Sequence, residues 1–289
     1  MMDAQQTSNA LFDRLQAALE AASGGTGRVT IAYSGGLDSR FLAFCAVRAG
    51  FGVRLLHAAG AHVSPEDTRE ALELARAMGL EAETVRPPLA SPATLARAGR
   101  ERCYVCKKAI FAHLKAMAEG GRLCDGTNAS DRGTFRPGAR ALAELGVHSP
   151  LAEAGFEKPE IRRQAAAPGL PLPGQAARPC LLTRFPYGVE PSAEALRLVA
   201  DVEAWLAGRP AAAGLSFRLR FPDGRHPALH LERAGLEDGD SGRPEAIRQE
   251  LLAHFGAALE GLTVTVMDRL SGYYDRIPIA AQAPEKARG

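Results

Sequence analysis

The chain has 289 residues, of which 46% are hydrophobic, and its formal net charge at pH 7 is +2. This length allows one large domain, or one ordinary domain with a smaller one, and the hydrophobic content is enough for a sizeable core. The nearly balanced charge argues against an extended nucleic-acid surface, and no apolar run approaches the ~20 residues of a membrane span. The first residues show no basic-then-apolar signal pattern, so we expect a cytoplasmic protein.

Strands and helices are predicted to alternate in the first half of the chain. Their predicted ranges are 29–33, 53–57, 81–85 and 122–124 for strands and 9–22, 40–49, 65–78 and 103–119 for helices. Such alternation is typical of βαβ units and a mostly parallel sheet. The region 130–184 is rich in Gly, Pro and Arg, and predicts loops with short helices near 140–145 and 159–166.

The last third of the chain predicts a small α+β module. Its predicted helices are 192–207 and 244–255, and its predicted strands are 215–221, 228–231 and 262–267. A break at Pro186-Tyr187-Gly188 separates this module from the rest. We therefore expect an α/β domain over residues 1–186 and a smaller α+β domain over residues 187–289.

The most informative motif is Ser34-Gly35-Gly36-Leu37-Asp38-Ser39, which follows the first predicted strand and opens a helix. The glycines allow a sharp turn and a close approach of the backbone to a ligand. The first N–H groups of the helix lack internal partners, so the turn is suited to phosphate or pyrophosphate. Ser34 and Ser39 add hydroxyl donors, and Asp38 could hold Mg²⁺ or a substrate amine. The motif has neither the lysine of a Walker A loop nor the third glycine of a dinucleotide fingerprint.

Polar residues at the end of the fourth predicted strand are further ligand candidates. Thr127, Asn128 and Asp131 follow that strand, where ligands bind in parallel sheets. They could contact ribose, adenine or Mg²⁺, although Asp-Gly is also an ordinary turn pair. Lys158 opens a short predicted helix, where it could compensate pyrophosphate charge or merely belong to a capped surface helix.

Three of the five cysteines are candidates for chemistry. Cys103 and Cys106 form a CxxC pair at a helix start, and Cys180 lies in a loop between two arginines. One CxxC pair is not a complete tetrahedral metal site, but three thiolates can hold three irons of a [4Fe–4S] cube and leave the fourth iron open. The alternative is an inert CxxC and one buried thiol.

Two arginines of the C-terminal module alternate along one predicted strand. Arg218 and Arg220 therefore lie on the same face, and a pair of arginines is suited to a phosphate group. Solvated surface charge is the competing interpretation.

The chain resembles the LarE family of PP-loop, ATP-dependent sulfur transferases. The resemblance covers residues 29–188 approximately and continues more loosely to about residue 268. It rests on six sequence strings that occur in the same order as in the family, namely SGGLDS, RCYVCK, DGTNASD, RPGARALAELGVHSPL, KPEIR and PCLLTRFPYG. It implies a PP-loop ATP pyrophosphatase fold, similar to adenine nucleotide alpha hydrolases. The sequence departs from the family pattern at Arg40, where a small residue is expected, and at Leu229-His230-Leu231-Glu232.

The resemblance implies a reaction in which ATP adenylates a carboxylate of pyridinium-3,5-biscarboxylic acid mononucleotide. Pyrophosphate leaves, sulfur displaces AMP, and the thiocarboxylate serves nickel-pincer cofactor synthesis. In the family, the sulfur comes either from a cysteine matching Cys180, or through a [4Fe–4S] cluster on three cysteines matching Cys103, Cys106 and Cys180. The presence of all three favours the cluster.

The same resemblance implies that Ser34, Gly35, Gly36, Asp38 and Ser39 would hold the pyrophosphate part of ATP, and that Arg218 and Arg220 would bind the phosphate of the substrate. From their places in the sequence, we further expect Thr127, Asn128 and Lys158 to bind ATP, Arg184 to contact the substrate and Asp131 to hold Mg²⁺. A sulfide donor and a homo-oligomeric state are expected by the same analogy.

Two other functions are compatible with these motifs. One is a cluster-dependent tRNA thiolase, against which the balanced charge argues. The other is a non-catalytic nucleotide or redox sensor, for which a broken SGGLDS string would be expected.

Overall fold

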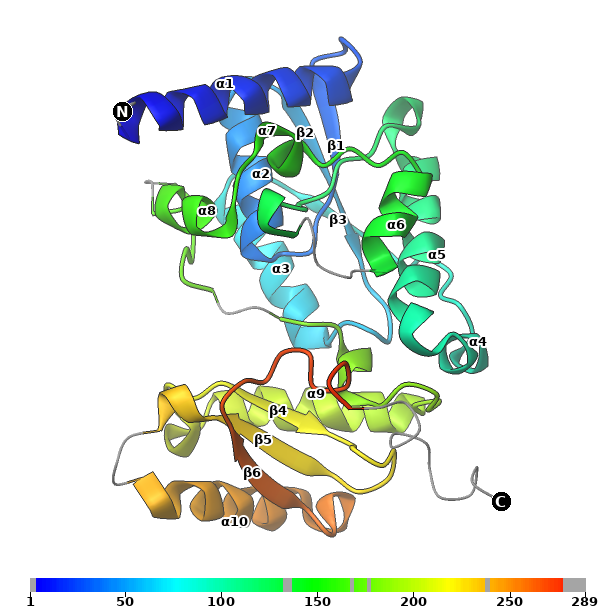
Figure 1. Ribbon diagram of the computed structural model, residues 1–289, viewed down its shortest axis with the longest axis vertical. Coiled ribbons are helices and arrows are strands. Elements are labelled where there is room, and N and C mark those ends of the chain that lie inside the picture. The colour runs from blue at the N-terminus through cyan, green and yellow to red at the C-terminus, as the bar shows by residue number, and fades with distance from the viewer. Residues whose placement is uncertain (1–3, 132–136, 167–168, 176–177, 237–239, 278–289) are drawn as a thin grey trace. The chain divides into compact units, whose positions relative to one another are not determined.

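The computed structural model describes residues 4–131, 137–166, 169–175, 178–236 and 240–277 (Figure 1). The chain forms two compact units. The first comprises Met1–Gly60, Asp67–Ala90 and Cys103–Arg178, and the second comprises Ala61–Glu66, Ser91–Arg102 and Pro179–Gly289. None of the described helices combines the length and the apolar character needed to cross a bilayer.

The first unit is an α/β structure, as the alternation of strands and helices predicts. Its elements are α1 (Ala4–Ser23), β1 (Arg28–Ala32), α2 (Leu37–Arg48), β2 (Gly52–Ala58), α3 (Pro65–Ala77), β3 (Ala82–Val85), α5 (Arg102–Met117), α6 (Pro137–Glu144), α7 (Pro150–Ala154) and α8 (Lys158–Gln164). The strands form a parallel sheet in the order β1-β2-β3, with Val29 opposite Val53 and Leu55 opposite Ala82. Their carboxyl ends share one edge, where parallel sheets bind ligands.

The strand predicted at 122–124 is shorter than expected. In the structure only Cys124 bridges β1, opposite Ile31, and it also bridges His148 on its other side. The Cys124 N–H donates to the Thr30 carbonyl at 2.8 Å, and the Ala32 N–H donates to the Cys124 carbonyl at 2.8 Å. These bridges extend hydrogen bonding past β1 and place the residues after Cys124 beside the end of β1.

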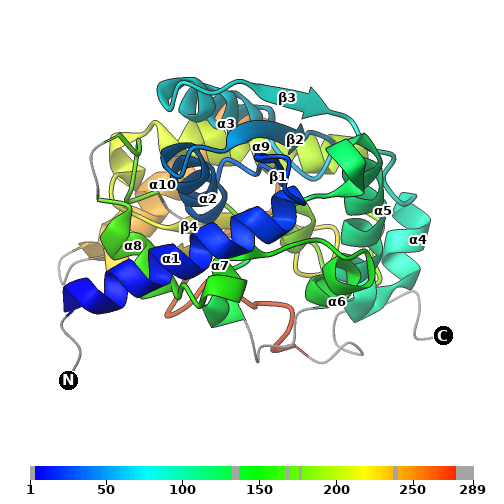
Figure 2. The same ribbon diagram turned by 90° about the horizontal axis from the view of Figure 1, so that it is seen from above.

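Helices α1, α2 and α7 meet in an apolar core. Phe12 on α1, Phe41 on α2 and Phe156 after α7 form an aromatic cluster with ring centroids 5.5–6.5 Å apart. Helices α1 and α7 lie side by side in both views (Figures 1 and 2). Burial of Phe41 and Phe156 fixes α2, the helix that follows the glycine-rich loop.

The second unit contains the α+β module that the sequence predicts. Its elements are α4 (Pro92–Arg97), a 3₁₀ helix η4 (Leu181–Arg184), α9 (Ala193–Ala207), β4 (Phe217–Arg220), β5 (Ala228–Glu232), α10 (Arg243–Phe255) and β6 (Thr263–Met267). Strand β5 pairs antiparallel with β4 and parallel with β6. The parallel pairing needs a crossover, and α10 supplies it.

The units do not follow the predicted division at residues 186 and 187. The main segment of the second unit begins at Pro179, and two short segments from earlier in the chain belong to the same unit. Hydrogen bonds explain this grouping, because the Leu181 N–H donates to the His62 carbonyl at 3.0 Å and the buried Arg102 donates to the Phe185 carbonyl at 3.2 Å. Contacts between segments that are distant in the sequence cannot be predicted from amino-acid composition.

Candidate functional site

The glycine-rich turn after β1 packs tightly against α3. Gly35 has φ +75°, and a Cβ at this position would lie 2.4 Å from the Ala71 Cβ. The preceding Tyr33 is buried, and its hydroxyl donates to the Ala71 carbonyl at 3.1 Å. Both the left-handed backbone and the close approach require glycine at position 35.

The two serines of the motif organise the interior of the turn. Their hydroxyl oxygens lie 3.1 Å apart, the Gly36 N–H meets the Ser34 hydroxyl at 3.3 Å, and the Ser39 hydroxyl donates to the Gly36 carbonyl at 3.0 Å. Gly36 occupies the N-cap position of α2, which has no side-chain cap. The start of α2 therefore offers uncapped N–H groups and a positive dipole end to an anion.

Asp38 is the centre of a charged network. Its Oδ2 accepts from Lys158 Nζ at 2.6 Å and from Asn128 Nδ2 at 3.3 Å. Its Oδ1 is buried and has no hydrogen-bond partner among the described residues. A buried carboxylate oxygen without a partner is costly, and a metal ion or a ligand donor would satisfy it. The residues present therefore fit a nucleotide with its Mg²⁺.

The turn after Cys124 packs directly against the start of α2. A Cβ on Gly126 would lie 2.8 Å from the Ser39 nitrogen, so only glycine fits there. Asp125 is buried and accepts from the Thr127 N–H at 3.2 Å and from the Ser149 hydroxyl at 2.7 Å. The sequence motif marks this turn as polar, but nothing in it identifies Ser149 as the partner that holds Asp125.

The other predicted nucleotide residues of this region lie close by. The Asn128 N–H donates to Asp131 Oδ2 at 3.4 Å, and the Lys158 N–H donates to the Ser130 hydroxyl at 2.9 Å. The structure thus connects Asn128, Asp131 and Lys158 with Asp38 through short contacts in the first unit. Their binding roles remain predictions.

Position separates the five cysteines into two groups, two in the core cluster of the first unit and three near a helix start or in a loop. Cys45 and Cys124 are buried in the core, and this burial raises the pKa of each thiol to about 12. Cys103 is exposed and Cys106 buried in the first turn of α5, whereas Cys180 is half-buried before η4. None of the five forms a disulfide. Cys103, Cys106 and Cys180 therefore remain the candidates for thiolate chemistry.

The iron–sulfur expectation stays a prediction. Cys103 and Cys106 belong to the first unit, and Cys180 belongs to the second. No group of three or more His, Cys, Asp or Glu side chains arranged to hold a metal ion is found in the described part of the chain.

The backbone around Cys180 is held by a buried ion pair. Arg184 donates to the Pro179 carbonyl at 3.3 Å, and its guanidinium makes two hydrogen bonds to Glu203 at 2.7 and 2.8 Å. The Cys180 carbonyl accepts from the Thr183 hydroxyl at 2.7 Å. Arg184 thus fixes the loop of Cys180, a role that its predicted substrate contact did not include.

A second arginine of this unit has a different environment. Arg220 on β4 is buried, and it contacts His230 Nδ1 at 2.7 Å and the Leu270 carbonyl at 2.5 Å. Its Nε is buried without a partner among the described residues. Burial, and then the neighbouring cations Arg184 and Arg218, lower the pKa of Arg220 to about 10. This arrangement is suited to an anion.

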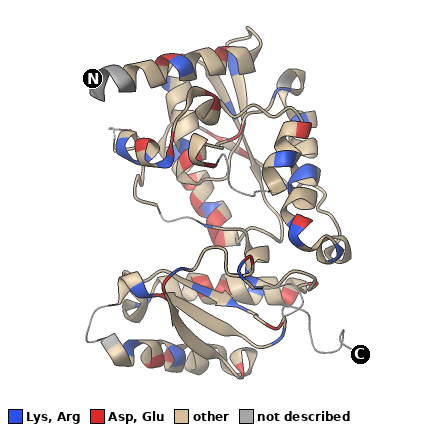
Figure 3. Ribbon diagram, viewed as in Figure 1, with Lys and Arg blue, Asp and Glu red and all other residues tan. Residues whose placement is uncertain are grey.

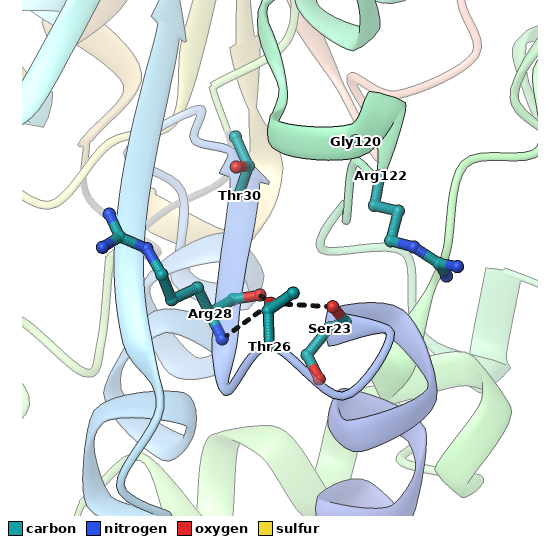
Figure 4. A pocket seen from close by; sticks show the side chains of 6 residues that line it. All are labelled: Ser23, Thr26, Arg28, Thr30, Gly120 and Arg122. Atoms are coloured by element: carbon teal, nitrogen blue, oxygen red, sulfur yellow. Dashed lines mark hydrogen bonds between the residues drawn. The ribbon is translucent and has the colours of Figure 1, made fainter.

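A pocket lies at the amino end of β1, the end opposite the glycine-rich turn. It is lined by Ser23, Thr26, Arg28, Thr30, Gly120 and Arg122. Figure 4 shows the guanidinium groups of Arg28 and Arg122 directed away from each other. Divergent cations do not form a chelating anion site, so this pocket is poorly suited to a phosphate chain.

Several known proteins are similar to the chain, although no protein-family model matches it. Protein slr1717 of Synechocystis sp. is 37% identical over 184 residues, which are 62% of this chain and 68% of that protein. Pyridinium-3,5-bisthiocarboxylic acid mononucleotide synthase of Lactiplantibacillus plantarum is 29% identical over 62% of this chain and 67% of that protein. Among solved structures, NMN synthetase from Francisella tularensis superposes with a TM-score of 0.46 at 19% identity, over 61% of this chain and 76% of that one.

The parallel α/β sheet, with the SGGLDS turn at its carboxyl edge, places the chain in the adenine nucleotide alpha hydrolase-like fold class. Within that class the chain belongs to the same family as Synechocystis slr1717, and it is a distant homologue of LarE, the L. plantarum synthase.

Proposed function

We propose that the chain is an ATP-dependent sulfur transferase acting on a small nucleotide-like carboxylic acid. A carboxylate oxygen of the substrate attacks the α-phosphorus of ATP, and the bond to the bridging oxygen of pyrophosphate breaks. Sulfur then attacks the acyl carbon of the adenylate, and AMP leaves with the carboxylate oxygen. The substrate that the LarE relation suggests is pyridinium-3,5-biscarboxylic acid mononucleotide.

The observation that carries the proposal is the environment of Asp38. One carboxylate oxygen contacts Lys158 and Asn128. The other is buried beside a glycine turn and an uncapped helix start, and it has no hydrogen-bond partner in the described part of the chain. The cationic Lys158 and the uncapped start of α2 suit phosphate oxygens, while the Asp38 oxygen that lacks a partner among the described residues suits Mg²⁺. This pairing of donors and acceptor is what a magnesium–triphosphate group requires.

The second unit supplies a candidate site for the phosphate of the substrate. Arg220 is a buried cation whose Nε has no partner among the residues that the structure describes, and Arg218 lies on the same face of β4. A buried guanidinium with an unsatisfied N–H donor gains from an anionic ligand. We propose that these two arginines bind that phosphate, while Arg184 serves the loop of Cys180.

The proposed sulfur source is a hydrosulfide carried by a [4Fe–4S] cluster, which Cys103, Cys106 and Cys180 would hold. When bound, the cluster supplies a nucleophilic sulfur without consuming a cysteine. Direct donation by Cys180 is the competing source. Iron and sulfide analysis of anaerobically purified protein, with each cysteine changed to Ala in turn, tests the cluster. Mass spectrometry after turnover tests Cys180, which loses the elements of H₂S only if it is the donor.

The experiment that tests the proposed function is acid-dependent pyrophosphate release. The protein is incubated with Mg-ATP and pyridinium-3,5-biscarboxylic acid mononucleotide, with nicotinic acid mononucleotide as a one-carboxylate comparison and bulk tRNA as the alternative acceptor. We expect release with the biscarboxylate and none with tRNA. Release that depends on tRNA would assign the chain to the thiolases instead.

A further inference from the structure

Arg40, the residue after the SGGLDS motif, is fully buried in the first unit. Arginine is rarely buried unless its donors are paired. Here Nε donates to the Gly35 carbonyl at 3.0 Å, Nη1 donates to the Pro171 carbonyl, and Nη2 donates to the Leu172 carbonyl at 3.1 Å and to Gln175 Oε1 at 2.9 Å. A single side chain therefore connects the PP-loop (residues 34–39) with residues 171, 172 and 175 of the 169–175 segment, which lie 131 to 135 positions further along the chain.

The contact with Gly35 controls the orientation of a backbone donor. The peptide between Gly35 and Gly36 is trans and planar, so its carbonyl and its N–H point in opposite directions. Because Arg40 holds the Gly35 carbonyl on one side, the Gly36 N–H is directed to the other. Gly36 is the N-cap of α2, where an anion would bind.

The contacts with residues 169–175 stabilise an unfavourable backbone. Leu172 has φ +49° and is the one non-glycine residue with positive φ among the described residues. A Cβ makes this conformation costly, so surrounding contacts must maintain it. The hydrogen bond from Arg40 to the Leu172 carbonyl is such a contact, and the buried Leu170 adds an apolar one.

Helix α3 supports the same segment from its acidic side (Figure 3). Glu70 accepts from Gln175 Nε2 at 3.3 Å and forms an ion pair with Arg178, which also contacts Asp67 at 3.2 Å. The next residue, Ala71, is the one that packs on Gly35. The PP-loop and the 169–175 segment thus share two supports, Arg40 and α3.

We propose that Arg40 is a positioning residue that holds the PP-loop in its phosphate-receiving conformation and couples it to the 169–175 segment. The proposal rests on the proposed function in one respect, that the ligand of the loop is the phosphate chain of ATP. In the structure the Gly36 N–H donates to the Ser34 hydroxyl at 3.3 Å. A phosphate oxygen that shares this donor or takes it over polarises the same peptide and strengthens the bond between the Gly35 carbonyl and Arg40. Nucleotide binding thereby steadies the segment that leads, five residues after Gln175, to Cys180.

The test uses the full-length protein, Mg²⁺ and α,β-methylene-ATP, which cannot release pyrophosphate. Three variants are compared with the natural protein: Arg40→Met, Gln175→Ala and, as a matched control on the exposed face of α2, Arg48→Met. Two quantities are measured for each protein. One is the dissociation constant of α,β-methylene-ATP, and the other is the hydrogen–deuterium exchange rate of a peptide covering residues 169–175. Circular dichroism confirms that each variant is folded.

Without nucleotide, we expect Arg40→Met to increase exchange in 169–175 about tenfold, while Arg48→Met leaves it unchanged. With nucleotide, we expect the natural protein to gain protection there, and Arg40→Met to bind about tenfold more weakly and gain none even at saturation. Gln175→Ala keeps the bond to Gly35, so its affinity should stay within about twofold while the gain in protection falls.

Two outcomes would overturn the inference. Equal exchange rates of residues 169–175 in Arg40→Met and Arg48→Met without nucleotide would show that Arg40 does not anchor the segment. Equal affinity for α,β-methylene-ATP and equal nucleotide-dependent protection of residues 169–175 in these two variants would show that Arg40 does not couple the PP-loop to the segment. If the natural protein binds no nucleotide, the proposed function fails together with the coupling, and the comparison without nucleotide still decides the anchoring.

Discussion

Lys158 Nζ lies 2.6 Å from Asp38 Oδ2, although 120 residues separate the two in the chain. The pair joins the start of α8 to the first turn of α2. The other oxygen of Asp38 is buried and has no partner within the described ranges of the chain, and a magnesium–nucleotide complex would satisfy it. The chemistry proposed for this chain begins at this pair.

Removing the lysine tests the nucleotide site. In Lys158→Met we expect acid-dependent pyrophosphate release to fall about 100-fold, since loss of one preorganised electrostatic donor has an effect of this order. Lys108→Met is the matched control, because Lys108 forms an exposed ion pair with Glu144. Steady-state pyrophosphate assays on both variants check this, and equal rates in the two would remove Lys158 from the site.

A methyl group on Gly126 should disturb the same site from the opposite side. The added Cβ would lie 2.8 Å from the Ser39 nitrogen, so the turn or α2 must move. We expect Gly126→Ala to lower the free energy of unfolding by about 1–3 kcal/mol and to weaken nucleotide binding. Gly242→Ala, where no atom lies within 4 Å of the added Cβ, is the control. Urea unfolding and nucleotide titration measure both effects.

The ion pair beneath Cys180 predicts a stability effect in the second unit. Arg184 and Glu203 are largely buried, with side-chain exposures of 4% and 16%. Glu203→Gln leaves the guanidinium without its counter-ion, which we expect to destabilise the protein by about 3 kcal/mol. The double variant Arg184→Met with Glu203→Leu should be more stable than the single one. Urea denaturation followed by circular dichroism gives the comparison, and an unchanged single variant would argue that the pair is dispensable.

The PP-loop could be predicted from the sequence, whereas the residues that hold it in place could not. The PP-loop, the parallel sheet and the C-terminal module were predictable, because glycine pairs, β-branched runs and helical periodicity are local signals. The short helices α4 and α7 were not predicted, since elements of five or six residues show too little periodicity.

The supports of the site are long-range contacts and have no local signal. Arginine in a helix is ordinarily solvated, so the sequence marks Arg40 only as unusual and does not indicate burial. The same holds for Ser149, which holds Asp125, and for Glu203, which holds Arg184. Each depends on which distant segment folds against it.

The buried histidine of β5 predicts a pH dependence of stability. Burial and the neighbouring Arg220 lower the pKa of His230 from 6.5 to about 4. Between these pH values His230 is protonated in the unfolded chain but neutral in the folded protein. The free energy of unfolding therefore falls as pH decreases from about 6.5 to about 4, and the contribution of the neutral His230 to stability is complete above pH 6.5. The contribution amounts to at most about 3 kcal/mol.

His230→Gln isolates this contribution from that of the carboxylates, which titrate in the same range. We expect urea midpoints of the natural protein to fall more steeply than those of the variant between pH 6.5 and pH 4. Added inorganic phosphate should reduce the difference if it binds beside Arg220. Parallel curves for the two proteins would contradict the assignment of the pH dependence to His230.

The cleavage position in ATP is the most direct test of the central claim, that the turn from Ser34 to Ser39 binds the phosphates of a nucleotide for adenylate transfer. The products formed from Mg-ATP with the biscarboxylate substrate are separated and quantified by anion-exchange chromatography. The account predicts AMP and pyrophosphate in equal amounts, formed only when the acid is present. Formation of ADP and inorganic phosphate, or no consumption of ATP with any acid, would contradict it.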